Sequence, residues 1–267
     1  MHNKNNYIII PILLLVSLIF SSCENSSIEP ENPTGKLRIE FNHYINGENI
    51  IFDSMAYVND AGNNYLVNEI QYFISDVTLH KNDGSTIILN TWQDILYVDT
   101  DIDETNSYIF KDEISEDEYS KLSFTFGIVA EKNNSLMFVN PPETFMFWPE
   151  LLGGGYHYMK LNGKWNNELN QPAPFNFHLG IGQIYYSFPD SISEYVQNHF
   201  IVELPEMALN IKDNETTTIK LIMNVDRWFN TPNIYDHNFW GGDIMQKQDA
   251  MQQAIENGHN VFSYIIK

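Results

Sequence analysis

Residues 37–43 read Leu37-Arg38-Ile39-Glu40-Phe41-Asn42-His43, with an apolar side chain at every second position until His43. Because successive side chains of a β-strand point to opposite faces, this alternation predicts a strand with one buried face. The alternation recurs in Leu122-Ser123-Phe124-Thr125-Phe126-Gly127-Ile128 and in Ile219-Lys220-Leu221-Ile222-Met223-Asn224-Val225. The repeated pattern predicts a β-rich fold.

Further strand-like runs lie between turn signals such as Asn46-Gly47, Asn82-Asp83-Gly84 and Asn162-Gly163. These runs cover residues 71–79, 86–89, 95–98, 156–161, 175–179, 184–188 and 200–204. About ten short strands predict an all-β fold, namely a β-sandwich of antiparallel strands or a flattened barrel. A short C-terminal helix follows, because apolar residues from Ile244 to Ile255 keep roughly helical spacing before Asn257-Gly258. Without an internal repeat or linker, residues 36–267 are expected to form a single domain.

The composition limits the partners of this chain. Its 267 residues carry 14 Lys+Arg against 35 Asp+Glu, a formal net charge of -21. The basic residues are scattered singly, so the chain lacks the positive patch that a nucleic-acid backbone requires. Hydrophobic residues make up 43% of the chain, which is typical of a packed globule and not of a disordered protein. No nucleic-acid partner is therefore expected.

The N-terminal residues predict export and anchoring to a membrane. Residues 1–22 combine Lys4, an apolar run and small residues, which is typical of a signal peptide. They end directly before Cys23, the single cysteine of the chain, as in a bacterial lipobox. We therefore expect a lipid on Cys23, a tether over residues 23–35, and a cell-envelope lipoprotein of the outer membrane on its periplasmic or surface side. The alternative is a secreted protein with a buried thiol.

Common enzyme signatures are absent from the sequence. It contains no glycine-rich phosphate loop, no G-x-S-x-G elbow and no H-E-x-x-H motif. With the only cysteine assigned to the anchor, thiol catalysis is excluded, and a binding protein is favoured over an enzyme. Asp99, Asp101 and Asp103 alternate at a strand end and offer a possible calcium site, although the segment lacks the glycine and distal glutamate of an EF-hand loop.

The histidines are the most informative candidates for chemistry. Strand parity places His43 on an apolar face, places His157 on the face of Met159, and turns His178 away from its neighbouring phenylalanines. His237, beside an aspartate in a loop, is a candidate for a fourth contact. Imidazoles that converge from separate strands form copper or zinc sites. His43, His157 and His178 are the predicted metal ligands.

A function without metal is the main alternative. The aromatic residues Trp148, Tyr156, Tyr158 and Trp165 surround the glycine turn before His157 and offer a platform for glycans or a protein partner. Such a platform binds through exposed aromatic faces. Burial of these residues around clustered histidines would favour a metal site, whereas a flat exposed strip would favour the platform.

The order of the motifs resembles the MbnP-like copper-binding protein family, in the form of its Bacteroidetes-type lipoprotein members. The resemblance spans nearly the whole chain after the lipobox. It rests on Phe41-Asn42-His43-Tyr44-Ile45-Asn46-Gly47-Glu48, residues 69–79, Phe124-Thr125-Phe126-Gly127-Ile128, Met146-Phe147-Trp148, Gly155-Tyr156-His157-Tyr158-Met159-Lys160-Leu161-Asn162-Gly163 and residues 175–180.

This resemblance implies a β-rich, non-enzymatic protein that binds copper through histidines in copper uptake, storage or delivery. His178 matches the family's Phe-x-Phe-His-Leu-Gly motif, and His43 matches the early strand motif. In characterised relatives, a tryptophan near the metal is oxidised to kynurenine, a change attributed to a partner dihaem protein of the cytochrome c peroxidase type. Trp148 matches the family's Met-x-Trp motif and is the expected position of that change, although Pro149 and Glu150 follow it where many members carry a second aromatic residue.

Overall fold

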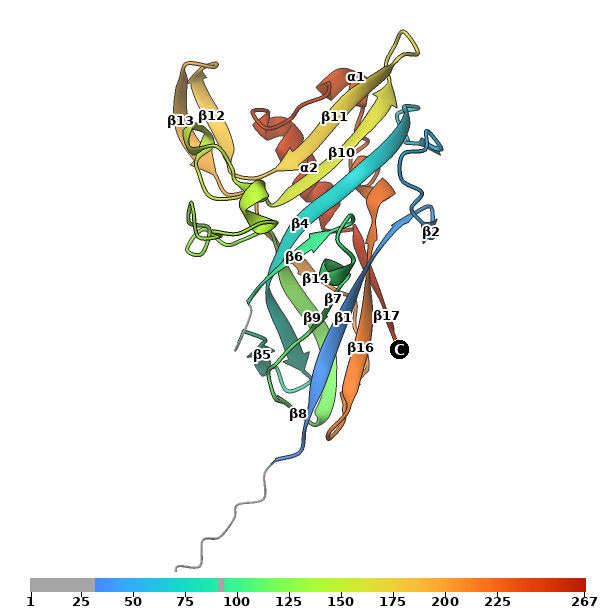
Figure 1. Ribbon diagram of the computed structural model, residues 1–267, viewed down its shortest axis with the longest axis vertical. Coiled ribbons are helices and arrows are strands. Elements are labelled where there is room, and N and C mark those ends of the chain that lie inside the picture. The colour runs from blue at the N-terminus through green and yellow to red at the C-terminus, as the bar shows by residue number, and fades with distance from the viewer. Residues whose placement is uncertain (1–31, 91–93) are drawn as a thin grey trace, which may run out of the picture. The chain divides into compact units, whose positions relative to one another are not determined.

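The computed structural model describes residues 32–90 and 94–267, and Asn32–Lys267 form one compact unit. The predicted signal peptide and Cys23 lie outside the described residues, as does most of the tether. Two large sheets and a two-stranded hairpin dominate this unit (Figure 1). Within the described residues, no helix is long and apolar enough to cross a membrane.

The smaller of the two large sheets has six strands and is built around β1. Its strands are β1 (Thr34–Ile45), β2 (Glu48–Asn49), β7 (Ser107–Ile109), β8 (Ile114–Ser115), β16 (Thr216–Asn224) and β17 (Phe262–Ile266). The alternation of residues 37–43 is realised, because buried and half-buried positions alternate along the whole of β1. The pair β1–β16 is parallel, whereas the named strands otherwise pair antiparallel.

The larger sheet is built around β4, whose neighbours on its two sides are β9 and β10. Its strands are β3 (Tyr57–Val58), β4 (Asn64–Lys81), β5 (Thr86–Ile88), β6 (Ile95–Asp99), β9 (Asp117–Phe126), β10 (Met159–Asn166), β11 (Pro172–Leu179), β14 (Phe200–Glu203) and β15 (Leu209–Ile211). The separate hairpin consists of β12 (Gly182–Ser187) and β13 (Ser191–Val196).

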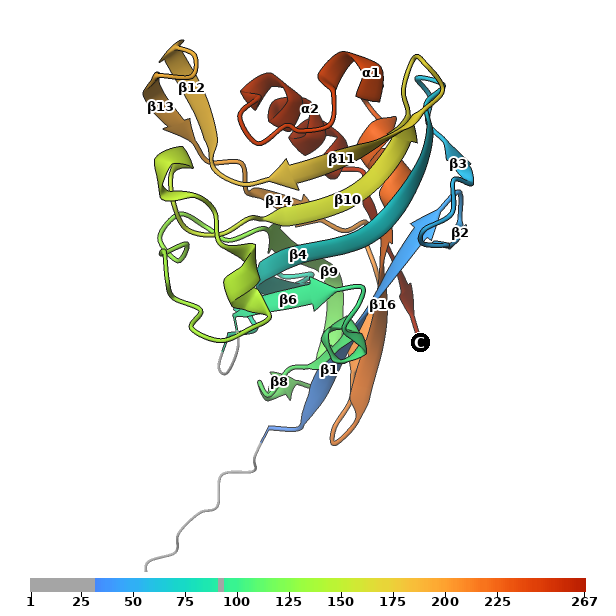
Figure 2. The same ribbon diagram turned by 45° about the horizontal axis from the view of Figure 1, so that its top comes forward.

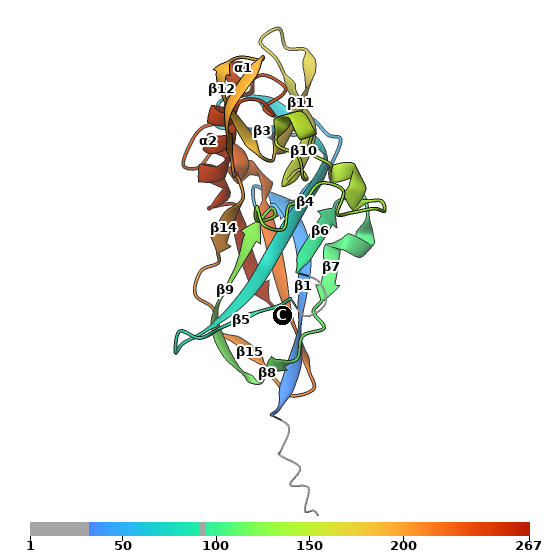
Figure 3. The same ribbon diagram turned by 90° about the vertical axis from the view of Figure 1, so that its left-hand side faces the viewer.

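The two sheets pack as a sandwich (Figure 3), and aromatic contacts join them. Phe41 of β1 meets Tyr72 of β4 with ring centroids 6.2 Å apart, and Phe124 of β9 meets Phe262 of β17 at 5.1 Å. All four side chains are buried. Such pairs add to the burial of apolar area that drives the sheets together. The predicted all-β sandwich is confirmed.

Helical segments are short. They are η1 (Asp103–Asn106), η2 (Glu143–Met146), η3 (Glu150–Leu152), η4 (Val225–Phe229), α1 (His237–Trp240) and α2 (Gln248–Gly258). The predicted C-terminal helix is therefore present as α2, with Met251 and Ala254 buried. It begins at Gln248, later than the apolar spacing suggested, and β17 follows it as an additional strand.

The strands β4, β10 and β11 have two different faces. The register aligns Tyr72, Met159 and Leu179, which are buried in the core, and aligns Gln71, Lys160 and His178 on the opposite face. We call this second face the polar face. The segment between β9 and β10, residues 127–158, carries η2 and η3 and lies beside the start of β10 (Figure 2).

The predicted turn at Asn162-Gly163 does not exist. Both residues lie inside β10, which pairs with β4 and β11 and has an irregular register at this point. A Cβ atom on Gly163 would lie 2.2 Å from the carbonyl oxygen of Leu66. The glycine therefore serves a close approach of two backbones and not a turn.

Candidate metal centre

Two of the predicted ligands and the predicted tryptophan come together at the start of β10. The ring centroids of His157 and His178 are 5.1 Å apart, and those of Trp148 and His157 are 4.6 Å apart. Both contacts are edge-to-face, with interplanar angles of 84° and 78°. Trp148 is fully buried, and His157 is 5% exposed. The centre is thus a compact cluster of three rings, of which Trp148 and His157 are buried and His178 is half-buried.

His157 reaches this cluster by a route that strand parity did not predict. Parity placed it on the face of Met159, but β10 begins at Met159, so His157 precedes the strand and escapes its alternation. Its ring packs against His178, which pairs with Lys160 on the polar face. His157 and Met159 therefore do not share a face, since Met159 is buried in the core.

A hydrogen bond sets the tautomer of His157. Its Nδ1 lies 2.9 Å from the carbonyl oxygen of Met146, and a carbonyl oxygen can only accept. Nδ1 must therefore carry the proton, which leaves the lone pair on Nε2. This Nε2 atom is buried and has no hydrogen-bond partner among the described residues.

A two-step relay sets the tautomer of His178. Asn162 donates from Nδ2 to Oε1 of Glu69 over 2.6 Å, which turns its Oδ1 atom toward His178. Nε2 of His178 donates to that oxygen over 2.7 Å. The lone pair of His178 is therefore on Nδ1, which is also buried and without a partner among the described residues. The cluster holds two imidazoles, each with one free lone pair.

Burial keeps both imidazoles neutral. It lowers the pKa of His178 to about 4, with the charge of Lys160 acting in the same direction and Asp243 opposing it. Burial also lowers the pKa of His157 well below its ordinary value, followed by the charges of His178 and Lys160. Lys160 is held in place by donating to the Phe145 carbonyl oxygen over 2.5 Å. At neutral pH, neither lone pair has to be freed of a proton before it binds a metal.

The donor set fits a metal ion that accepts imidazole nitrogen. A buried polar atom without a partner costs roughly 1–3 kcal/mol, and an ion bound to both nitrogens would remove this cost twice. An ion bonded to two imidazoles at about 2 Å keeps their ring centroids within about 6 Å of each other, and the observed 5.1 Å lies inside this limit. In residues 32–90 and 94–267, no three His, Cys, Asp or Glu side chains form a metal-holding group.

The third predicted ligand lies elsewhere. His43 belongs to β1, and its Nε2 lies 3.2 Å from the hydroxyl of Tyr72. Because Tyr72 points into the core and His178 lies on the polar face, His43 and His178 are on opposite faces of the larger sheet. Burial lowers the pKa of His43 to about 4. Of the three predicted ligands, His43 is thus the one that lies apart from the cluster.

His237 does not supply a fourth contact. It is fully buried in an aromatic cage, stacked on Phe175 at 4.5 Å and on Trp165 at 5.7 Å, on the core face of β10 and β11. Neither of its ring nitrogens has a hydrogen-bond partner among the described residues. Burial lowers its pKa to about 3.

In the predicted calcium site, the carboxylate of Asp99 accepts hydrogen bonds from other groups of the chain. Asp99 is 3% exposed and accepts hydrogen bonds from the Gln71 amide, the Tyr97 hydroxyl and the backbone N–H of Asp101. Asp101 and Asp103 are exposed. Calcium at this loop stays a prediction from the sequence.

The predicted aromatic platform is wrong. Trp148, Tyr156, Tyr158 and Trp165 are between 0% and 7% exposed, so their faces are covered by other residues of the chain. Of these four residues, Trp148 packs against a histidine of the cluster, and burial beside clustered histidines is the arrangement expected for a metal site.

Sequence reasoning missed the residues that support the cluster. Glu69, Asn162 and Lys160 were not selected, although Lys160 and Asn162 follow His157 by three and five positions. Their alternation with Met159 and Leu161 was the available signal, because it places them on one polar face. The pairing of β10 with β4, which brings Glu69 to Asn162, cannot be read from one strand.

Comparison with known proteins identifies the family of this chain. A family model described as MbnP matches residues 34–246. Among solved structures, MbnP from Methylosinus trichosporium is similar in fold, with a TM-score of 0.50 and 14% sequence identity over 75% of this chain and 79% of that chain. No curated protein sequence matches. The resemblance of the motifs is confirmed, and the chain belongs to the MbnP family.

Proposed function

We propose that this chain is a copper-binding protein whose ion is held by His157 and His178. One observation carries the proposal: two neighbouring neutral imidazoles each present a buried lone pair that no group of the described chain uses. In metal sites, a ligating histidine donates its second ring N–H to a carbonyl or carboxylate oxygen, as both histidines do here. The familial resemblance to copper-binding proteins favours copper among the metals that imidazole suits.

The charges around the cluster favour copper in its monovalent state. Lys160 lies close enough to lower the pKa of both histidines, so its ammonium group also repels a bound cation. This repulsion is twice as large for a divalent ion as for a monovalent one at the same position. Asp243 opposes this repulsion at His178, but Lys160 has the larger effect of the two. Two neutral ligands with a lysine as the dominant nearby charge therefore discriminate against Zn²⁺ and favour Cu⁺.

Anchoring and modification complete the proposal. The chain is proposed to be tethered to the outer membrane by a lipid on Cys23 and to serve copper uptake, storage or delivery without catalysing a reaction. Trp148 is proposed as the oxidised residue, with a dihaem protein of the cytochrome c peroxidase type as partner. Its indole lies edge-to-face against His157, and its Nε1 donates to the Leu152 carbonyl oxygen over 3.1 Å.

Isothermal titration of the metal-free full chain with Cu⁺ and Zn²⁺ tests the proposed site. We expect one tight Cu⁺ site with a dissociation constant below micromolar, weaker binding of Zn²⁺, and a loss of affinity of at least about 100-fold in His157→Ala and in His178→Ala. His43→Ala and His259→Ala are the matched controls, because these histidines lie outside the cluster and His259 is exposed. Unchanged binding in both cluster variants would overturn the site.

The modification has its own test. Protein purified from its native host is digested, and the mass of the peptide that contains Trp148 is measured. We expect the mass of kynurenine at this position, and an unmodified tryptophan would remove this part of the proposal while leaving the copper site untouched.

A further inference from the structure

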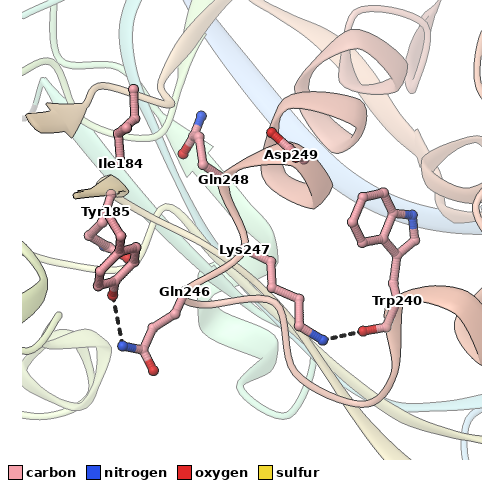
Figure 4. Close-up of a pocket in the computed structure, with 8 residues that line it drawn as sticks. Ile184, Tyr185, Trp240, Gln246, Lys247, Gln248 and Asp249 are labelled. Atoms are coloured by element: carbon pink, nitrogen blue, oxygen red, sulfur yellow. Dashed lines mark hydrogen bonds between the residues drawn. The ribbon is translucent and has the colours of Figure 1, made fainter. Parts of the chain in front are cut away.

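A cavity of about 450 Å³ lies between the β12–β13 hairpin and the beginning of α2 (Figure 4). Tyr185 of the hairpin and Trp240 lie on opposite sides of it, and Gln246 and Gln248 lie between them. The hydroxyl of Tyr185 accepts a hydrogen bond from Gln246 over 2.8 Å, which joins the hairpin to the segment before α2. The cavity contains neither His157 nor His178 and is separate from the metal centre.

Gln183, one of the residues that line the cavity, has an unused acceptor. The residue is 2% exposed. Its Nε2 atom donates to the carbonyl oxygens of Leu152 and Ile181 over 2.8 and 2.5 Å, so the orientation of the amide is set. Its Oε1 atom is buried and has no partner among the described residues. A buried acceptor of this kind requires a donor such as a hydroxyl group.

The N-terminus of α2 supplies unused donors. Lys247 is the residue before the helix and makes no side-chain capping bond. Its ammonium group instead donates to the Trp240 carbonyl oxygen. In the described part of the chain, the backbone N–H groups of Gln248 and Asp249, which both line the cavity, have no hydrogen-bond acceptor. Free N–H groups in the first helical turn bind acceptor groups of a ligand.

The charges disfavour an anionic ligand. Asp249 lies in the first turn of α2, where its carboxylate already interacts with the helix dipole and repels a second negative charge. The chain as a whole carries a formal net charge of -21, which adds to this repulsion. The ligand therefore has to donate and accept hydrogen bonds without being an anion.

Hydroxyl groups both donate and accept hydrogen bonds without carrying a charge. The two aromatic rings can contact the apolar faces of a molecule that carries several hydroxyl groups. Tyr185 and Trp240 are half-buried, so each ring leaves part of its surface open. Aromatic rings beside amide and carboxylate groups suit a pyranose, whose C–H faces are apolar and whose rim is polar. We propose that this cavity binds a neutral sugar, a function beyond copper binding that uses none of the metal ligands.

An array of immobilised neutral and acidic glycans, probed with labelled metal-free full chain, tests the proposal. We expect retention on neutral glycans. Competition with free glucose and free cellobiose then separates a site for free sugars from one for glycan ends, since only the former is blocked by the free sugars. Absence of binding to every neutral glycan and both free sugars, or retention by acidic glycans alone, would overturn the proposal.

Variants of the hairpin supply the control. Tyr185→Ala and Gln183→Leu are each expected to weaken binding about tenfold or more, because each removes one contact from the cavity. Tyr186→Ala is the matched control, since Tyr186 is the next residue of the same strand, is 89% exposed and does not line the cavity. Circular dichroism checks whether Gln183→Leu, which changes a buried residue, still folds. If Gln183→Leu does not fold, the comparison of Tyr185→Ala with Tyr186→Ala decides between the proposal and its rejection. Equal binding of the two tyrosine variants would contradict the site.

Discussion

Asn162 determines which nitrogen of His178 is free. Its Oδ1 accepts from His178, and its Nδ2 donates to Glu69, so it transmits the orientation of a carboxylate to a proposed ligand. We predict that Asn162→Leu lowers the affinity for Cu⁺ by about 10- to 100-fold, the usual effect of removing a group that orients a metal ligand. Titration calorimetry measures this affinity.

The variant Glu69→Gln separates orientation from charge. A glutamine keeps an oxygen that can accept from Asn162 but removes a negative charge from the polar face. We therefore expect a smaller loss of affinity than in Asn162→Leu. An unchanged affinity in Asn162→Leu would show that His178 does not need the relay.

His237 makes the stability of the fold depend on pH. Its pKa is lowered to about 3 by burial, opposed by the charge of Asp236, while in the unfolded chain it has the ordinary value of 6.5. Between these values the unfolded state binds more protons, so stability present above pH 6.5 is lost as the pH falls toward 3. At pH 5 this single residue is expected to cost about 2 kcal/mol relative to pH 7.5.

The variant His237→Phe isolates this contribution. An apolar ring in the aromatic cage has no nitrogen to leave without a partner, and it cannot titrate. Urea unfolding of the metal-free protein at pH 7.5 and pH 5 is expected to show a smaller loss of stability for the variant than for the wild type. An equal loss in both proteins would contradict the assignment, with His259→Phe as the control at an exposed histidine.

The sequence predicted which residues are candidates for the site better than it predicted which of them lie together in the fold. The sequence indicated histidines and, by resemblance, a tryptophan near the metal, and His157, His178 and Trp148 do lie together. Parity failed for His157 because it assumes that a strand continues, whereas β10 begins two residues later. His43 was selected by strand parity and by motif order, and neither reveals the long-range pairing that sets the sheet to which a strand belongs.

At the scale of elements, the end of β11 positions the indole of Trp148. Gly180 follows this strand, and a Cβ atom there would lie 2.6 Å from Cε3 of Trp148. We predict that Gly180→Ala costs about 1–3 kcal/mol of stability, because a close-packed site cannot admit another carbon without displacing the ring. It should also weaken Cu⁺ binding, since Trp148 packs on His157.

A double variant tests whether the clash is the cause. Trp148→Phe removes the fused six-membered ring that a Cβ at position 180 would meet. The stability cost of Gly180→Ala is therefore expected to be smaller in the Trp148→Phe background, as measured by urea unfolding of the four proteins of a double-mutant cycle. Additive costs would show that Gly180 acts through the backbone and not through the indole.

Whether a strand could be predicted from alternation depended on how its side chains are buried. Alternation located β1 because one of its faces is buried and the other half-buried. In β9 and β16 the apolar period follows the core face, although Ser123, Thr125 and Ile222 on the other face are buried as well. The strand β13 was missed, because its burial pattern lacks a buried position and its sequence therefore lacks an apolar period. The parallel pairing of β1 with β16 could not be predicted, because alternation within a strand is the same for either direction of its neighbour.

At the scale of the whole molecule, the acidic composition and the metal centre have separate roles. The excess of acidic residues keeps the protein soluble and attracts cations toward its surface, an effect that falls with ionic strength. The cluster itself contains two neutral imidazoles and lies near a lysine. Under the proposed function, attraction over long distances therefore comes from the surface, whereas the choice of ion comes from the proposed site.

The proposed lipid anchor belongs to this scale too, because it decides where the whole domain resides. Cys23 precedes the described unit that begins at Asn32, so its replacement leaves the residues of the sandwich and the cluster unchanged. We predict that Cys23→Ser moves the full chain, expressed in its native host, from the membrane fraction to the soluble fraction. Acyl chains contribute about 0.8 kcal/mol per buried methylene group to membrane binding, and a serine carries none.

Two measurements make this prediction decisive. Labelling with a fatty acid analogue should mark the wild-type protein and not the variant, and Cu⁺ titration of the two purified proteins should give equal affinities. If the variant stays in the membrane fraction, the anchor on Cys23 is contradicted while the metal centre is not. If both proteins are soluble and unlabelled, the N-terminal segment directs secretion alone, and copper is bound by a protein that is free to leave the cell surface.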